Sequence, residues 1–110
     1  MSTPDEAGFM AEVEAIIARA PDLSPLDAGV LAALDQDVAR DSRTFAKLFG
    51  VAHALVLRAV SELADGSGLV AVDSRDARTQ RTRLALTPAG RQLLASLQGD
   101  AATGERWLAS

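Results

Sequence analysis

A single glycine, Gly50, separates two short helical patterns and limits how this chain can fold. Residues 43–49 gather apolar side chains on one face, and residues 52–64 repeat an apolar stripe at the 3.6-residue spacing of an α-helix. Glycine readily adopts the left-handed conformation that ends one helix and turns the chain into the next. Two short helices joined in this way are typical of a helix-turn-helix. A helical hairpin in an all-α core would look the same, so the residues that follow decide between the two.

A predicted β-hairpin comes directly after the second helix. Residues 65–68, Asp-Gly-Ser-Gly, signal a turn, and residues 69–72 and 80–86 are typical of two strands around a polar loop at 74–80. Thr82, Leu84 and Leu86 share one face of the second strand. A two-stranded hairpin is marginal by itself and must lean on the helices. An arginine-rich hairpin in this position predicts the wing of a winged helix-turn-helix.

Helical patterns flank this core on both sides. Residues 3–6, Thr-Pro-Asp-Glu, predict a capping box for a helix that reaches Ala20, and residues 24–27 repeat the start signal for a second helix to about Asp35. Leu26, Val30, Leu31 and Leu34 form the expected buried stripe of that second helix. The fold class is therefore mainly α with a small β-hairpin. We expect one domain over residues 1–110, with an N-terminal helix (1–20), a winged helix-turn-helix core (24–87) and a C-terminal helical segment (88–110). The first helix packs either on its own domain or on a partner subunit.

Composition and charge exclude several function classes. The sequence has no cysteine, no tyrosine and one histidine, so it predicts no catalytic set, no metal site and no cofactor. No apolar run reaches the roughly 20 residues of a membrane span, and the acidic N-terminus lacks the features of a signal peptide, so we expect a cytoplasmic protein. Residues 1–42 carry nine acidic and two basic side chains, whereas residues 43–91 carry eight basic and four acidic ones. The helix-turn-helix and hairpin are thus the basic part of an acidic chain, which favours contact with phosphate.

Three stretches carry a family resemblance: residues 45–51 (FAKLFGV), residues 68–72 (GLVAV) and residues 86–91 (LTPAGR) after the hairpin. Over residues 26–94 the chain resembles the winged helix of MarR-type bacterial transcriptional regulators, although PadR-like regulators have similar endings. The resemblance implies a DNA-binding regulator, a dimeric repressor with a possible small-molecule effector, because many such proteins release DNA on binding a small phenolic compound or on oxidation. It implies a homodimer formed through two segments, Asp5–Ala20 and Pro88–Leu108. The absence of cysteine excludes sensing by cysteine oxidation.

The resemblance also assigns residues to the DNA. The recognition helix, residues 52–64, would enter the major groove, and the wing, residues 74–81, would touch the minor groove. On a helical projection Ala52, Val56, Ala59, Val60 and Leu63 face the core. The DNA-binding residues are then Arg43, Lys47, His53, Ala54, Leu55, Leu57, Arg58, Ser61, Arg75, Arg78 and Arg81, with Arg83 as a further phosphate contact. Asp73 and Asp76 could pin some of these arginines.

The recognition helix departs from the family pattern. Ala52 stands where a capping serine or threonine is usual, and residues 53–57 are His-Ala-Leu-Val-Leu where polar readers are usual. Residues 65–68 are about one residue longer than usual, and Asp76-Ala77-Arg78 only approximates the wing pattern. Leucines contact a thymine methyl but form no hydrogen bonds to bases. An alternative function follows, in which Leu55 and Leu57 dock a protein partner and the chain no longer reads DNA.

Overall fold

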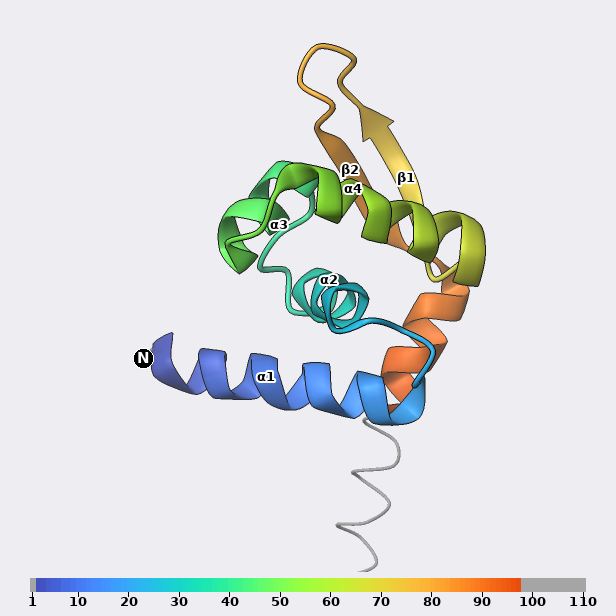
Figure 1. Ribbon diagram of the computed structural model, residues 1–110. Helices are drawn as coiled ribbons and strands as arrows, with labels where there is room; N and C mark the ends of the chain where they lie inside the picture. Colours follow the sequence, from blue (N-terminus) through green and yellow to red (C-terminus); the bar gives the residue numbers. More distant parts are fainter. Residues whose placement is uncertain (1, 98–110) are drawn as a thin grey trace, which may run out of the picture.

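The computed structural model describes the backbone of residues 2–97 and the side chains of residues 7–97. The helices are α1 (Ser2–Arg19), α2 (Pro25–Asp35), α3 (Ser42–Phe49) and α4 (His53–Ser61), and α4 continues into the π-helix η1 (Glu62–Ser67). The strands β1 (Val70–Arg75) and β2 (Thr82–Leu86) form an antiparallel hairpin, and residues 88–97 form a further helix. In Figure 1, α2 lies between α1 on one side and the α3–α4 pair on the other, and the hairpin projects away from α1. The predicted mainly α winged helix-turn-helix is confirmed.

Two predictions fall outside these residues. The capping box expected at residues 3–6 involves side chains that the structure does not describe. The part of the expected dimer segment beyond residue 97 lies outside the described chain as well.

Helix α2 is the centre of the core. Every residue from Asp27 to Ala33 is buried, so the helix is enclosed on most of its circumference. The predicted stripe was too narrow: Val30 and Leu31 are fully buried, but Leu26 and Leu34 are only partly covered. Small residues explain the difference, because alanine and glycine let neighbouring helices approach α2 closely. A Cβ atom at Gly29 would lie 3.3 Å from Cζ of Phe49, whose ring packs against it.

The local signals that start and end the helices are confirmed. Ser24 and Asp27 form a reciprocal capping box at α2. Asp41 caps α3, accepting from the backbone N–H of Thr44 at 2.9 Å. Gly50 has a φ of 66°, which is the left-handed conformation that the turn between α3 and α4 requires.

The predicted turn at residues 65–68 is wrong. Residues 62–67 stay helical as a π-helix, which Gly68 ends with a φ of 70°. A π-turn holds one more residue than an α-turn, so it absorbs the extra residue noted in this stretch. The strands also differ from expectation: β1 begins at Val70 and extends to Arg75, and β2 begins at Thr82. The register shifts between Val72 and Ser74, and the loop is reduced to residues 76–81.

The segment after β2 closes the hairpin against the helices. The hydroxyl of Thr87 donates to the carbonyl of Gly68 at 2.6 Å and accepts from the backbone N–H of Gly90 at 3.1 Å. Gly90 is buried against the backbone of Leu69, the residue directly before β1. A Cβ atom at Gly90 would collide with the carbonyl oxygen of Leu69. The Thr-Pro-Ala-Gly sequence therefore caps the helix at residues 88–97 and allows that helix to pack directly on the backbone near Leu69.

Replacing Gly90 by alanine should destabilise the fold, because the new methyl group meets backbone rather than a movable side chain. We expect a loss of about 1–3 kcal/mol in the free energy of unfolding, measured by urea denaturation. Gly8→Ala is the matched control, since nothing lies within 4 Å of its added Cβ and alanine favours the helix interior. Equal effects of the two substitutions would contradict the close approach.

Two carboxyl groups meet where α1 packs on α2. Oε1 of Glu12 accepts from Nε2 of Gln36 at 2.6 Å, and the Glu12 carboxyl also hydrogen-bonds with Asp35. Burial, followed by the hydrogen bond with Asp35, raises the pKa of Glu12 to about 7, against an opposing effect of Gln36. The α1–α2 contact is thus favoured when Glu12 is protonated.

This contact predicts a specific pH dependence of stability. Since the folded pKa of Glu12 is raised, its contribution is fully present below the unfolded value of 4.5 and is lost as pH rises through about 7. Glu12→Gln should therefore reduce the fall in unfolding free energy between pH 5 and pH 7.5, measured by urea denaturation. Glu14→Gln, at an exposed site on the same helix, is the control. A Glu12→Gln curve parallel to the wild-type curve would refute this role.

Candidate nucleic-acid interface

The predicted faces of the recognition helix are largely confirmed. Val56, Ala59, Val60 and Leu63 are buried, whereas Ala54, Leu55, Arg58 and Ser61 are exposed and Leu57 is partly covered. Ala52 is a correction: it was expected in the core and is exposed. It precedes α4 as an extended N-cap residue with a ψ of 141° and makes no side-chain cap bond, so helical spacing does not apply to it.

Four consecutive residues attach the wing to the helix-turn-helix. The carbonyl of Arg40 accepts from the N–H of Leu84 at 2.9 Å, and Asp41 forms a bridge pair with Arg83. The hydroxyl oxygen of Ser42 accepts from the N–H of Thr82 at 2.9 Å. The guanidinium of Arg43 donates to the carbonyl of Thr79 in the wing loop at 2.7 Å. Residues 40–43, called here the wing anchor, thus fix the hairpin at the N-terminal end of α3.

The wing anchor also reaches the recognition helix. Nε2 of His53, the first residue of α4, lies 2.7 Å from Oγ of Ser42. Ser42 and Thr82 are completely buried, and His53 is partly exposed. His53 was predicted to reach a phosphate or a base edge, and its Nε2 is instead occupied by this contact. Burial and the charge of Arg43 lower the pKa of His53, against the opposing charge of Asp41, which favours the neutral imidazole.

Sequence reasoning missed Ser42 and Thr82. Neither residue carries a local signal, because Ser42 is simply the first residue of α3 and Thr82 the first of β2. The bond between them joins positions 40 residues apart. Only the folded arrangement brings them together.

The predicted arginines divide into engaged and free groups. Arg43 binds the wing loop, Nε of Arg75 donates to the Thr82 hydroxyl at 3.3 Å, and Arg81 lies 3.7 Å from Asp41. Arg58 lies 3.8 Å from Glu62 in an exposed pair on α4, a contact of little energetic weight. Among the residues that the structure describes, the exposed side chains of Lys47, Arg78 and Arg83 form no ion pair or hydrogen bond.

The aspartates of the wing do not pair with these guanidinium groups. The carboxylate of Asp76 accepts from the backbone N–H of Arg78 at 2.8 Å and so shapes the loop, leaving the Arg78 side chain unbound. The acidic partner of Arg81 is Asp41, on the wing anchor rather than in the hairpin. The guanidinium of Arg78 at the tip therefore stays available to a ligand.

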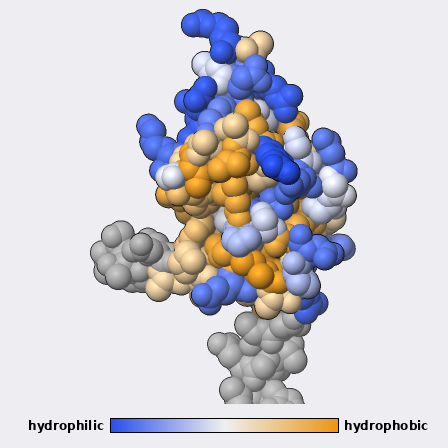
Figure 2. All heavy atoms as spheres, in the orientation of Figure 1, coloured by the Kyte–Doolittle hydropathy of each residue, from blue (hydrophilic) through white to orange (hydrophobic). Residues whose placement is uncertain are grey.

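Hydrophobic and hydrophilic residues are unevenly distributed over the surface. Figure 2 shows hydrophilic residues over most of the projecting hairpin and hydrophobic residues gathered over the helices below it. Leu55 on α4 is 50% exposed, and Leu48 on α3 is 47% exposed. The outward side of the recognition helix is therefore apolar at Leu55 and cationic at Arg58.

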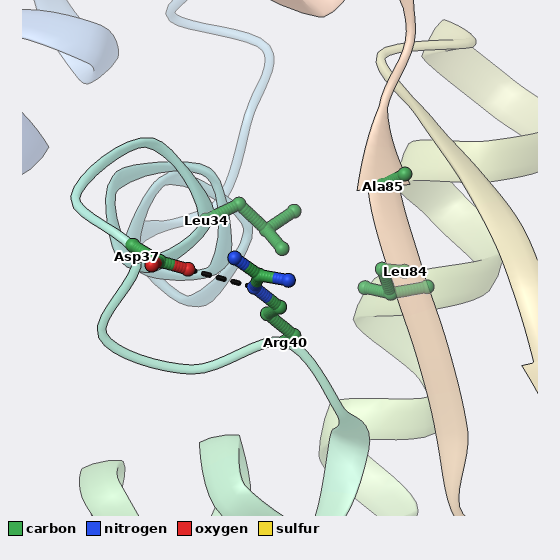
Figure 3. A pocket seen from close by; sticks show the side chains of 5 residues that line it. All are labelled: Leu34, Asp37, Arg40, Leu84 and Ala85. Carbon is green, nitrogen blue, oxygen red and sulfur yellow. Dashed lines mark hydrogen bonds and ion pairs between the residues drawn. The ribbon is translucent and has the colours of Figure 1, made fainter.

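A hollow of about 270 Å³ lies on the side of β2. Figure 3 shows Leu34, Asp37 and Arg40, from the end of α2 and the following loop, facing Leu84 and Ala85 on β2. The Arg40 guanidinium is already paired with Asp37 at 2.7 Å. The hollow is open and slightly smaller than the roughly 300–1,000 Å³ of a usual small-molecule site.

The described residues contain neither a membrane-spanning helix nor a cluster of metal-ligating side chains. Within residues 2–97, no helix is long and apolar enough to cross a membrane. In the same part of the chain, no group of three or more histidine, cysteine, aspartate or glutamate residues could hold a metal ion.

Solved structures with a similar fold are transcriptional regulators. The regulator Tm0710 from Thermotoga maritima matches at a TM-score of 0.69 and 18% identity, and BldR from Sulfolobus solfataricus at 0.58 and 23%. Both matches cover 96% of this chain and 75% of the other. PcaV from Streptomyces coelicolor, solved with its natural ligand, matches at 0.53 and 31% identity over 78% of this chain and 60% of its own. No protein-family model and no curated protein sequence matches.

The fold and these neighbours define a class, the winged helix-turn-helix transcriptional regulators. Within that class, the resemblance to MarR-type regulators is confirmed.

Proposed function

We propose that this protein is a dimeric DNA-binding repressor that places α4 in the major groove and the wing loop in the minor groove. The observation that carries the proposal is the wing anchor. Through Ser42 and Arg43 it holds the recognition helix and the arginine-bearing hairpin in one fixed relation. A fixed relation of this kind lets a helix and a wing contact neighbouring grooves at the same time.

The free cations supply the electrostatic part of binding. The side chains of Lys47, Arg78 and Arg83 are exposed and form no ion pair or hydrogen bond among the described residues. They can therefore bind phosphates without first breaking an ion pair. Arg78 stands at the wing tip, where a guanidinium suits a narrow, A·T-rich minor groove. Arg43, Arg75 and Arg81 are in part structural, since each already holds the hairpin in place.

Recognition of a DNA sequence would depend on few direct contacts to bases. Ala54 and Leu55 on the exposed side of α4 suit thymine methyl groups, and Arg58 and Ser61 can reach polar edges or phosphates. With so few hydrogen-bonding side chains, shape and deformability of the DNA would contribute strongly to specificity.

The dimer would form through α1 and the C-terminal segment. Met10 on α1 is 49% exposed, although Val13 and Ile16 on the same helix are buried in the core, so α1 packs inward and still offers an apolar side chain outward. A twofold dimer would bind half-sites about one helical turn apart. We further propose a cytoplasmic location, a small-molecule effector and no enzymatic activity.

Arg78→Ala should weaken DNA binding and reduce its dependence on salt. Removing one phosphate or minor-groove contact lowers the slope of log K against log salt by about 1. Fluorescence anisotropy with duplex DNA at several salt concentrations measures this, after selection of bound sequences to recover an operator. Arg91→Ala, exposed on the helix at residues 88–97 and outside the helix-turn-helix and wing, should leave the slope unchanged. Salt-insensitive binding by the wild-type protein would refute the proposal.

The exposure of Leu55 favours a second candidate, a protein-interaction module. Leu55 is half-exposed in the first turn of α4, and covering it with an apolar partner surface would be favourable. Leu57 is partly covered and would form the edge of such a contact.

For this second candidate, Leu55→Ser should abolish recovery of a protein partner while the fold stays intact by circular dichroism. Leu48→Ser is the matched control, because Leu48 is similarly exposed but lies on α3. Partner recovery that is equal for the two variants would count against docking on α4.

A further inference from the structure

The contact between Ser42 and His53 determines which ring nitrogen of His53 carries the proton. The Ser42 hydroxyl is completely buried and already accepts from the N–H of Thr82. Its own proton needs an acceptor, because a buried donor without one is unfavourable. Among the contacts of the described residues, the acceptor within reach is Nε2 of His53 at 2.7 Å.

The alternative arrangement leaves a proton unmatched. If Nε2 carried a proton, the Ser42 oxygen would accept from both Thr82 and His53, and its hydroxyl proton would have no acceptor. A protonated imidazolium would create the same conflict, because both ring nitrogens are then donors. The neutral form that burial and Arg43 favour, against Asp41, agrees with this count.

We propose that Ser42 is a positioning residue that fixes His53 as the Nδ1–H tautomer, so that the first turn of the recognition helix offers a neutral donor to an acceptor on DNA. This inference rests on the proposed function. Nδ1 makes no hydrogen bond among the described residues, and the His53 side chain is partly exposed. The acceptor is an oxygen or nitrogen of DNA, either a phosphate oxygen or a purine edge.

The same bond would couple the recognition helix to the wing. The chain of contacts runs from His53 on α4 through Ser42 on α3 to Thr82 on β2. A change at one end, such as protonation of His53, would disturb the hydrogen bond that anchors the hairpin. The protonation state of His53 would thus be coupled to the position of the wing.

The tautomer can be measured in the free, full-length protein. His53 is the only histidine, so a long-range ¹H–¹⁵N spectrum at pH 7.5 shows one imidazole, whose Nε2 couples to both Hε1 and Hδ2 and whose Nδ1 couples strongly only to Hε1. We expect Nε2 to have the shift of an unprotonated nitrogen and Nδ1 that of a protonated one. A protonated Nε2 would overturn the proposal.

Variants separate positioning from simple structural support. In Ser42→Ala, the Nε2–H form that free histidine prefers should reappear and the pKa of His53 should rise. Ser74→Ala, at an exposed serine on β1, should leave both unchanged. An unaltered tautomer in folded Ser42→Ala would overturn the role of Ser42. If Ser42→Ala does not fold, the wild-type spectrum still decides.

Two substitutions at His53 test the donor toward DNA. Asparagine keeps a donor near the place of Nδ1, whereas glutamine keeps only a group near the place of Nε2. We expect His53→Asn to bind a selected duplex within about twofold of wild type and His53→Gln to bind roughly 3- to 10-fold more weakly, the loss of one hydrogen bond. The reverse order, or no loss in either variant, would overturn the DNA contact.

Modified DNA distinguishes the two sources of the acceptor. If replacing purines by 7-deazapurines removes the difference between wild type and His53→Gln, the acceptor is a base. If methylphosphonate substitution removes it, the acceptor is a phosphate. Either result supports a hydrogen bond from Nδ1–H of His53 to DNA. Absence of any DNA binding by the wild-type protein would defeat the proposed function and the DNA contact together, whereas the tautomer is decided by the spectrum alone.

Discussion

The hydrogen bond from the Thr82 N–H to the Ser42 hydroxyl is the contact on which the arrangement of the DNA-facing elements depends. A two-stranded hairpin has too little core of its own to hold a position. Here Ser42 holds it at the loop end of its strands, where Thr82 pairs with Arg75, and Arg43 reaches the carbonyl of Thr79 in the loop. Because Ser42 also contacts His53, the hairpin and the recognition helix share a single attachment point.

Close packing around α2 brings α3 against it. The small side of α2 at Gly29 leaves room for the ring of Phe49. The Phe49 ring stacks on that of Phe45 at a centroid distance of 6.2 Å, and its centroid lies 6.1 Å from that of Phe9. Gly90 plays a similar part at the other end of the wing, where its missing side chain lets the last described helix meet the backbone near Leu69. Small residues thus let the Phe49 ring of α3 approach α2, and let the helix at residues 88–97 approach the chain just before β1.

The arginines show how one residue type can serve structure and binding in the same surface. Counting charge along the sequence places eight cations in residues 43–91 but cannot separate those held by the fold from those left free. The fold assigns Arg43, Arg75 and Arg81 to the hairpin and leaves Arg78 unpaired at its tip. An ion pair such as Arg81 with Asp41 depends on two elements meeting, which no local pattern describes.

Most helices could be located from the sequence, because caps, glycine turns and apolar periodicity act over only a few residues. Asp41, Gly50 and the Ser24–Asp27 box could be located from that local chemistry, and so could the buried side of α4. It misplaced Ala52 and the turn at residues 65–68, where a flanking extended residue and a π-helix break the regular spacing. The partners of Ser42, His53 and Thr82 could not be predicted in this way, because hydrogen bonds between residues far apart in the chain follow from packing and have no local sequence pattern.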